Sequence, residues 1–372
     1  MKLIEFYADG YKNLEDISIS PGEGINIIYG PNAQGKTNLM ESIGLFSGRD
    51  KLRTGGDGRN IGFNKEVASV RIKFDDGRRD QVGEIVFARK NKFLLNRVPL
   101  GSINEFCGNF CTIAFSPSHL SIVQGEPRLR RKFIDDAISQ MKPDYHKYCK
   151  QYDRVLLQRN SLLKSMNIGR ADTLDVWNLQ LARLGTIITI MRQDYVRKIE
   201  NIVSDIYDGI TIGKEKLKIY YQSTVFDEYL DNIYSEDKIQ TYLKKLESAI
   251  ETDISNGFTH NGVHRDDFIL KIDDLNVREY GSQGQQRSCV IALKLAESNL
   301  LKLISKSEPI ILLDDVMSEL DVNRQNYILN HVKNNQVFIT CCDISNTLNL
   351  KNGKIYYMLS GKIKSEISEK EC

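Results

Sequence analysis

Residues 25–46 read INIIYGPNAQGKTNLMESIGLF, and this stretch decides the fold. Ile25, Ile27 and Ile28 are β-branched neighbours, which predicts a buried parallel strand. From residue 38 onward apolar side chains recur at helical spacing, which predicts a helix over 38–46. A glycine-rich loop joins the two elements. A strand, a glycine-rich loop and a helix in this order are typical of a phosphate-binding loop.

The loop fits the pattern Gly-x-x-x-x-Gly-Lys-Thr, and a chance glycine-rich turn is the weak alternative. Glycines let backbone N–H groups approach phosphate oxygens at a helix N-terminus, whose dipole favours negative charge. Lys36 would reach the β- and γ-phosphates of ATP, and the Thr37 hydroxyl would be offered to Mg²⁺. The predicted nucleotide-binding residues are Gly30, Pro31, Asn32, Ala33, Gln34, Gly35, Lys36, Thr37 and Asn38.

A second half of the site is predicted at residues 308–321, EPIILLDDVMSELD. The continuous apolar run is typical of a central parallel strand, and it ends in Asp314 and Asp315. Ligands of open α/β sheets bind beyond the carboxyl ends of the strands, so Asp314 is expected to hold Mg²⁺ beside Thr37. Asp315 would then be the carboxylate nearest the attacking water. The competing interpretation is that the two acids cap a helix.

Residues 279–301, EYGSQGQQRSCVIALKLAESNLL, predict an amphipathic helix that begins just after a small polar cap. The cap is a second candidate phosphate reader at a helix N-terminus. One chain with one γ-phosphate does not need two readers. The second becomes useful if two chains sandwich two nucleotides and each chain completes its partner's site. The predicted residues of this signature, acting in trans, are Ser282, Gln283, Gly284 and Gln285.

The chain of 372 residues is long for one core and predicts two lobes. Its first hundred residues alternate strand-like runs with turns, and 127–207 then shows long helical periodicity. Two helices joined by a short segment predict an antiparallel hairpin, an arm projecting from the body. The predicted domains are a discontinuous ATPase head over 1–123 and 256–372, and a helical lobe with its arm over 124–255.

Charge and cysteine content narrow the class of protein. The net charge is only +2, but residues 49–97 carry thirteen Lys/Arg against seven Asp/Glu. A single basic run is usually a solvated surface. A second run, RLRRK at residues 128–132, also flanks the nucleotide site, and the two together favour phosphate contacts. The seven cysteines have no zinc spacing, and the sequence has no apolar leader or membrane-length run, so we expect a cytoplasmic protein. The candidate DNA contacts, chosen from charge alone, are Arg49, Arg53, Arg59, Arg128, Arg130 and Arg131.

The order of these motifs resembles the ATP-binding-cassette ATPases of the SMC and Rad50 type. The wording GKTNLMESI, FSP, RRKFID, HRDD, YGSQGQQR and LLDDVMSELD is similar to the RecF family of bacterial recombination mediators, and the resemblance spans essentially the whole chain. It implies an α/β ABC-ATPase head with a mixed, largely parallel sheet, and a helical lobe carrying a short antiparallel arm.

The resemblance also implies a function in recombinational repair and replication restart. Family members dimerise on ATP, bind DNA at gaps or junctions, act with RecO and RecR to load recombinase, and support the SOS response. Carried over by motif, Ser318, Glu319 and Asp321 would form the D-loop, Ser282 and Gly284 would touch the opposite γ-phosphate, and Asp315 with Lys36 would be catalytic. Aspartate in place of the commoner glutamate suggests weak hydrolysis that works as a dimerisation switch, stimulated by DNA.

Some positions depart from the family pattern. Pro31 and Ala33 stand where an acid and a glycine are expected, and no switch histidine follows the strand-like QVFIT; Thr340, Cys341, Cys342 and Asp343 stand there instead. The γ-phosphate sensor is therefore unassigned, and Gln124 is the candidate Q-loop residue.

Three interpretations compete at this point. The first is an ATP-switched DNA clamp of the RecF or another SMC-like type. The second is the ATPase subunit of a membrane transporter, which the basic β-rich segment and the arm oppose. The third is a small-molecule kinase, which leaves the signature at Ser282 without a purpose.

Overall fold

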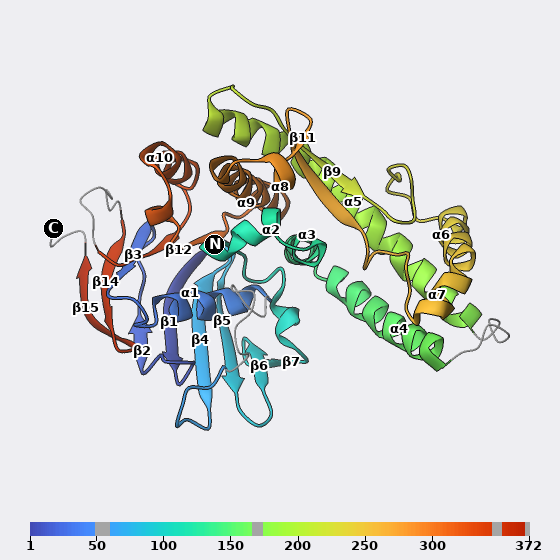
Figure 1. Ribbon diagram of the computed structural model, residues 1–372. Helices are drawn as coiled ribbons and strands as arrows, with labels where there is room; N and C mark the ends of the chain where they lie inside the picture. Colours follow the sequence, from blue (N-terminus) through green and yellow to red (C-terminus); the bar gives the residue numbers. More distant parts are fainter. Residues whose placement is uncertain (49–59, 166–173, 344–351, 369–372) are drawn as a thin grey trace. The chain divides into compact units, whose positions relative to one another are not determined.

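The computed structural model describes residues 1–48, 60–165, 174–343 and 352–368 (Figure 1). The chain divides into two compact units, one of Met1–Leu120 with Val290–Cys372 and one of Ser121–Cys289. Residues 256–289, assigned to the ATPase head by the sequence, group with the second unit in this division. The functional assignment of that segment stays a prediction.

The first unit is built around a six-stranded sheet in the order β15-β14-β3-β13-β12-β8. Its five strands from β14 to β8 pair in parallel, and β15 pairs antiparallel with β14 at one edge. The predicted central strands are therefore present, and their carboxyl ends share one edge of the sheet. The strand bounds are β3 (Ile25–Tyr29), β8 (Thr112–Phe115), β12 (Ile310–Asp314), β13 (Val337–Cys341), β14 (Lys354–Leu359) and β15 (Lys362–Ser368).

A second six-stranded sheet of this unit is antiparallel throughout, in the order β2-β1-β4-β5-β6-β7. The period-two alternation of residues 66–100 predicted this meander, and its first turn falls at Asp76–Arg79 as the Asp-Asp-Gly sequence indicated. The bounds are β1 (Lys2–Asp9), β2 (Ile17–Ile19), β4 (Ala68–Asp75), β5 (Asp80–Phe87), β6 (Lys92–Leu95) and β7 (Val98–Leu100).

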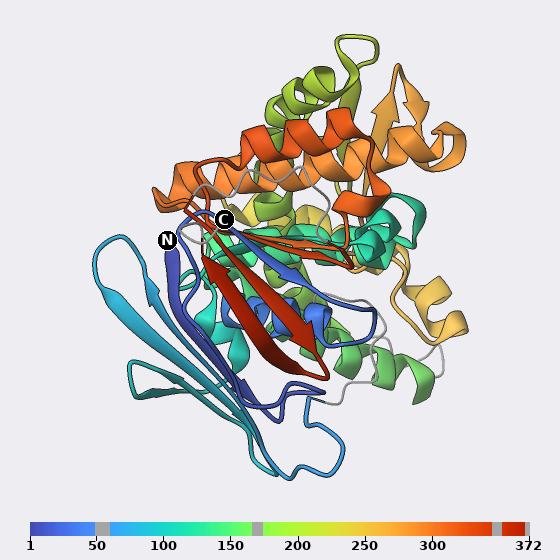
Figure 2. The same cartoon turned by 90° about the vertical axis from the view of Figure 1, so that its left-hand side faces the viewer.

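The helix α1 (Lys36–Gly44) lies between the two sheets (Figure 2). Leu39, Met40 and Ile43 are buried in one core cluster with Phe6 of β1 and Leu312 of β12. Glu41 and Ser42 of α1 are buried as well, so packing on more than one face fixes where the loop before α1 ends. The shorter helices of this unit are η1 (Leu45–Ser47), η2 (Ile103–Phe106), η3 (Pro117–Leu120), η5 (Met317–Glu319) and α10 (Val322–His331).

The second unit contains the predicted helical hairpin, α4 (Tyr145–Ser165) and α5 (Asp175–Thr211). Arg192 of α5 bonds Tyr145 near the start of α4, and Arg159 near the end of α4 bonds Asn178 near the start of α5. Because the pairing runs in opposite directions, the two helices are antiparallel. The other elements are α2 (Ser121–Gln124), α3 (Pro127–Met141), β9 (Leu217–Gln222), α6 (Glu236–Ser248), α7 (Ile250–Asn256), β10 (Asp267–Ile272), β11 (Leu275–Asn276) and α8 (Val277–Tyr280).

Charged groups inside the second unit are paired. Arg159 and Asp253, both fully buried, form an ion pair of 2.7 Å, and Arg159 also bonds the Thr259 hydroxyl. Arg192 makes two bonds of 2.9 Å to the carboxylate of Asp135. Buried charges need such partners, so this network ties α3, α4, α5 and α7 together.

The long helix α9 (Gln283–Ser305) begins in the second unit, and its residues from Val290 onward belong to the first. No helix within the described residues is long and apolar enough to span a bilayer.

Candidate nucleotide-binding site

The loop between β3 and α1 has the backbone shape that a phosphate cradle requires. Gly30, Ala33 and Gly35 all have positive φ angles, of 148°, 63° and 110°. Glycine adopts such angles freely, whereas Ala33 occupies the left-handed region at a cost, which explains why a glycine is expected there. A side chain at Gly30 would also lie 2.2 Å from the Met358 carbonyl oxygen, so neither the conformation nor the space allows one.

Lys36 is nearly buried at the start of α1, and its ammonium group turns back onto the loop. The Nζ atom donates to the carbonyl oxygens of Gly30, at 2.7 Å, and Pro31, at 2.9 Å. The positive charge therefore lies at the centre of the loop. Phosphate oxygens that entered the loop would meet this cation together with the backbone N–H groups of the α1 N-terminus.

The far end of the chain holds the same loop in place. Gln34 accepts the backbone N–H of Ser360 on its side-chain oxygen, at 2.6 Å, and that of Gly361 on its backbone oxygen, at 3.0 Å. Both donors lie in the turn between β14 and β15. On the other side, Asn38 donates to Asn13 at 2.7 Å. The C-terminal hairpin is thus part of the framework of the nucleotide site, which the sequence did not predict.

Thr37 and Asp314 come together as the sequence predicted. The Thr37 hydroxyl donates to Asp314 Oδ1 at 2.9 Å, and Asp314, at the end of β12, is 2% exposed. One hydroxyl and one carboxylate at the carboxyl edge of a parallel sheet are oxygen donors of the kind that Mg²⁺ prefers. The residues present therefore fit a magnesium ion.

Asp315 follows directly and leaves the strand with a left-handed backbone, φ 53°. Its N–H donates to the Thr340 hydroxyl at 2.9 Å, and the same hydroxyl lies 3.0 Å from Asp314 Oδ1. The helix-cap interpretation of the two acids is not what the structure shows for α10, because the residue that caps α10 is Asp321, whose side chain accepts the Arg324 N–H. Sequence reasoning noted Thr340 and did not assign it a role.

Two thiols, Cys341 and Cys342, stand in the segment 340–343, where the family pattern has a switch histidine. Cys341 ends β13, and burial raises the pKa of its thiol to about 11, while Lys36 nearby opposes the shift. Cys341 is therefore protonated at neutral pH. The next residue, Cys342, is exposed and donates from Sγ to Asn32 Oδ1 at 2.9 Å. Neither thiol can take on the positive charge available to a histidine.

The signature residues lie at the N-terminus of α9, in the second unit. The Ser282 hydroxyl accepts the N–H of Gln285, and the Gln285 side chain accepts the N–H of Ser282, at 3.2 and 2.7 Å. This reciprocal pair is a capping box. Gln285 also donates to Glu215, at 2.8 Å, and Gln124 donates to Gln286, at 2.7 Å. These hydrogen bonds hold the backbone at the start of α9.

The D-loop residues follow Asp315 within the first unit. Ser318 and Glu319 lie in η5, and the Ser318 hydroxyl donates to the Asp315 carbonyl at 3.0 Å. At Asp321, hydrogen bonds from the N–H and side chain of Arg324 lower the pKa of the carboxyl. Asp321 is therefore charged at neutral pH.

The predicted basic contacts differ in their surroundings. Arg130 is 5% exposed and makes a bidentate ion pair with Asp267, at 2.7 and 2.8 Å, so its charge is satisfied inside the second unit, contrary to the DNA contact predicted for it. Arg131 is half-buried and donates to the Asp266 carbonyl. Arg128 is exposed. Arg49, Arg53 and Arg59 lie outside the described residues.

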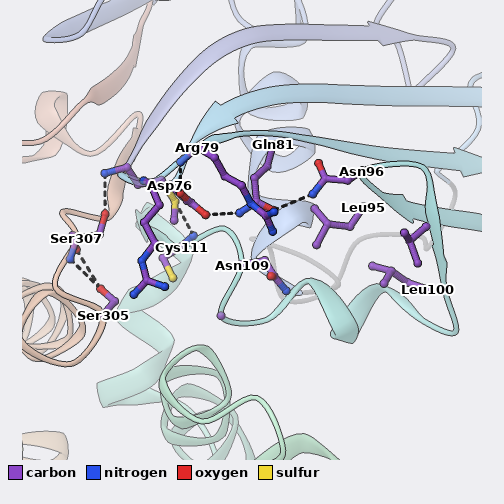
Figure 3. A pocket seen from close by; sticks show the side chains of 14 residues that line it. Asp76, Arg79, Gln81, Leu95, Asn96, Leu100, Asn109, Cys111, Ser305 and Ser307 are labelled. Carbon is purple, nitrogen blue, oxygen red and sulfur yellow. Dashed lines mark hydrogen bonds between the residues drawn. The ribbon is translucent and has the colours of Figure 1, made fainter.

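A separate polar pocket of about 530 Å³ lies in the first unit (Figure 3). Its floor is a chain of hydrogen bonds, because Gln81 donates to Asp76 and accepts from Asn96. Ser305 and Ser307, which also line it, precede β12, whereas Asp314 ends that strand. The pocket therefore belongs to the amino edge of the sheet and not to the site built on Thr37 and Asp314.

Comparisons with known proteins agree with this geometry. A family model described as an AAA domain matches residues 7–308. The chain is 37% identical over 370 residues to the DNA replication and repair protein RecF of Clostridioides difficile, covering 98% of each chain. It is also 37% identical over 357 residues to the RecF of Clostridium perfringens, covering 95% of this chain and 97% of the relative.

The chain belongs to the RecF family. Among solved structures, one described as the recombination mediator protein RecF-ATPrS in the RecFOR pathway matches with a TM-score of 0.88 and 32% identity, covering 97% of both chains. An SMC head domain bound to the C-terminal winged-helix domain of ScpA matches with a TM-score of 0.56 at 15% identity, which speaks for the fold alone. The predicted SMC-like ATPase fold and the RecF resemblance are both confirmed.

Proposed function

We propose that this RecF-family chain is an ATP-dependent DNA-binding protein of recombinational repair and replication restart. ATP joins two copies into a clamp on DNA, and slow hydrolysis releases it. The observation that carries the proposal is the contact of Thr37 with Asp314 beside the phosphate loop, in a chain 37% identical to proteins named DNA replication and repair protein RecF.

The nucleotide chemistry follows from the residues of the loop. The N–H groups at Gly35 and Lys36 would bind phosphate oxygens, and the Lys36 ammonium would exchange the carbonyls of Gly30 and Pro31 for the β- and γ-phosphates. Thr37 and Asp314 would hold Mg²⁺, which supplies charge neutralisation on the phosphates. Asp315 would orient and polarise the attacking water. Its side chain is one methylene shorter than glutamate, which favours slow turnover.

Dimerisation supplies the switch. Ser282 and Gly284, at the N-terminus of α9, would contact the γ-phosphate bound to the partner chain, and the capping box keeps their backbone ready. ATP can favour the dimer only through contacts that are absent in the monomer, and the signature provides such contacts. Ser318, Glu319 and Asp321 would line the same interface as the D-loop.

DNA is the proposed polymer partner, and RecO and RecR are the proposed protein partners in recombinase loading at gaps and in the SOS response. A structural relative is described as acting in the RecFOR pathway, which supports that assignment. Of the candidate DNA contacts Arg128, Arg130 and Arg131, Arg128 is the exposed one. Bound DNA would stimulate the slow ATPase. With DNA as its partner, the protein would act in the cytoplasm.

The test measures binding to duplex and gapped DNA with ATP, with ADP and without nucleotide, across a salt series. We expect affinity that rises with ATP and falls steeply with salt, since phosphate contacts release counterions. Lys36→Ala should abolish the ATP effect, because the loop loses its cation. The matched control is Lys147→Ala on α4, which removes an exposed lysine paired with Asp144. ATP-independent DNA binding, or none at low salt, would contradict the proposal.

A further inference from the structure

Thr340 connects the two carboxylates at the end of β12. It lies near the end of β13, is 1% exposed, and is paired in register with Asp314 on the neighbouring strand. Its hydroxyl lies 3.0 Å from Asp314 Oδ1 and 3.5 Å from Asp315 Oδ1. Its side chain is therefore within reach of both acids of the nucleotide site.

The Thr340 hydroxyl can donate one hydrogen bond and accept others. The oxygen accepts the Asp315 N–H, at 2.9 Å, so its own proton is available to donate. Asp314 Oδ1, at 3.0 Å, is the nearer acceptor and Asp315 Oδ1, at 3.5 Å, the farther one. Thr37 on α1 also donates to Asp314 Oδ1. This one oxygen therefore accepts hydrogen bonds from two hydroxyls, one on α1 and one on β13. The orientation of the Asp314 carboxylate is fixed by these two donors.

The contact with the backbone sets the place of Asp315. Its φ of 53° is a left-handed conformation, which aspartate tolerates better than most residues with a side chain. The hydroxyl of Thr340 receives the N–H of this residue and so stabilises the turn by which the chain leaves β12. Without the hydroxyl, a partly buried N–H would lose its partner and the turn would lose one of its supports.

We propose that Thr340 is a positioning residue of the nucleotide site, which orients Asp314 toward Thr37 and holds Asp315 at the strand end. The proposal rests on the proposed function, because it assigns Asp314 to the metal and Asp315 to the water. The hydroxyl of Thr340 makes the contacts with both acids that carry this assignment.

The alternative is that Thr340 only packs in the sheet, because β-branched residues are common in buried strands. Thr340→Val keeps the branched shape and removes only the hydroxyl, whereas Thr340→Ser keeps the hydroxyl and removes the methyl group. If Thr340 only fills space, Thr340→Val should keep Mg²⁺-dependent ATP binding and hydrolysis, and Thr340→Ser should reduce them. If Thr340 positions the two acids, Thr340→Val should reduce both activities and Thr340→Ser should keep them.

The experiment uses the full chain and two readouts. The first is the affinity for a non-hydrolysable ATP analogue in EDTA and in Mg²⁺, from the fluorescence of a labelled nucleotide. The second is kcat and KM for ATP. For Thr340→Val we expect unchanged affinity in EDTA, a Mg²⁺-dependent gain that shrinks about tenfold, and a kcat about tenfold lower, because each lost bond is to a charged group or a partly buried N–H. Thr340→Ser should restore both to within about threefold.

The matched control is Thr189→Val on α5. Thr189 is buried, and its hydroxyl has no hydrogen-bond partner among residues that the structure describes. This variant should change neither readout. Circular dichroism of each variant reports folding, and Thr340→Ala replaces Thr340→Val if the valine variant is unfolded.

The possible outcomes distinguish a failure of the proposed function from a failure of the role proposed for Thr340. Wild-type protein that binds no ATP would overturn the proposed function itself. Wild-type protein that binds and hydrolyses ATP, together with a folded Thr340→Val variant that keeps the full Mg²⁺ gain and kcat, would overturn the positioning role alone. So would a serine variant that is as impaired as valine.

Discussion

Thr37 and Asp314 are joined by a hydrogen bond of 2.9 Å although 277 positions separate them in the sequence. One residue lies in the first turn of α1 and the other ends β12, so the contact exists only when the parallel sheet is assembled with β3 two places from β12. Folding of the first unit and assembly of the predicted magnesium site are therefore one event.

Ser282→Arg tests the arrangement of two chains around each nucleotide. We expect normal ATP affinity, because Ser282 is proposed to serve the partner's nucleotide, together with loss of the ATP-dependent dimer, because a long cation would meet the opposite phosphate site. Light scattering with saturating Mg-ATP measures the dimer. Ser255→Arg, an exposed change on α7, is the control and should dimerise normally. A Ser282→Arg variant that dimerises like the wild type would reject the trans role.

Asp315→Asn tests the acid proposed to polarise water. Asparagine tolerates the left-handed φ of 53° as aspartate does, so the turn should be kept. We expect the ATP-bound dimer to persist and kcat to fall about a hundredfold, the typical loss of a positioned general base. Single-turnover hydrolysis measures this, with Asp16→Asn at another left-handed aspartate as the control. Unchanged hydrolysis would move the water-activating role to another residue.

The buried pair of Arg159 and Asp253 is expected to stabilise the second unit. Arg159→Met leaves the Asp253 carboxylate without its guanidinium partner inside the protein, which costs about 3–5 kcal/mol of the free energy of unfolding. Urea unfolding measures the change. Lys132→Met, which breaks a partly exposed pair with Asp136 on α3, is the control and should have little effect. Equal stability of the two variants would show that the buried pair is not needed.

A pH effect is expected from His264. Desolvation lowers its pKa from 6.5 to about 4, and its two ring nitrogens are used in the neutral form, one accepting from Tyr152 and one donating to Thr259. The unfolded chain binds this proton below pH 6.5 and the folded chain only below about 4, so stability falls as the pH drops through that window.

Between pH 7 and pH 5, His264 should lower the free energy of unfolding by about 2 kcal/mol. Urea unfolding of the wild type and of His264→Gln at both values measures it, and the glutamine variant should have a flatter profile. Parallel profiles for wild type and His264→Gln would contradict the assignment.

Much of the fold was predictable because its signals are local. The glycine loop, the apolar run that ends at Asp314 and the Asp-Asp-Gly turn are each readable within a few residues. Residues 237–254 show how a local pattern can be incomplete: they predict one helix, but α6 ends at Ser248 and α7 begins at Ile250, and no helix-breaking residue marks the change.

The remaining features depend on pairing across the chain. Thr340 reaches Asp314 and Asp315 only through the register of β13 on β12. Arg130 was predicted to contact DNA from its charge, and its burial depends on Asp267, 137 positions away. Neither partner is visible in a local pattern, which is why charge alone misplaced Arg130 and left Thr340 without a role.

The turn between β14 and β15 has a practical meaning for anyone who handles this protein. Since Ser360 and Gly361 support Gln34, a chain cut short before residue 360 would lose two anchors of its catalytic loop and not merely a tail. Proteolytic nicking near that end should silence ATP binding while the second unit survives. Affinity tags and fluorescent fusions at that end therefore call for an ATP-binding check before any result obtained with them is interpreted.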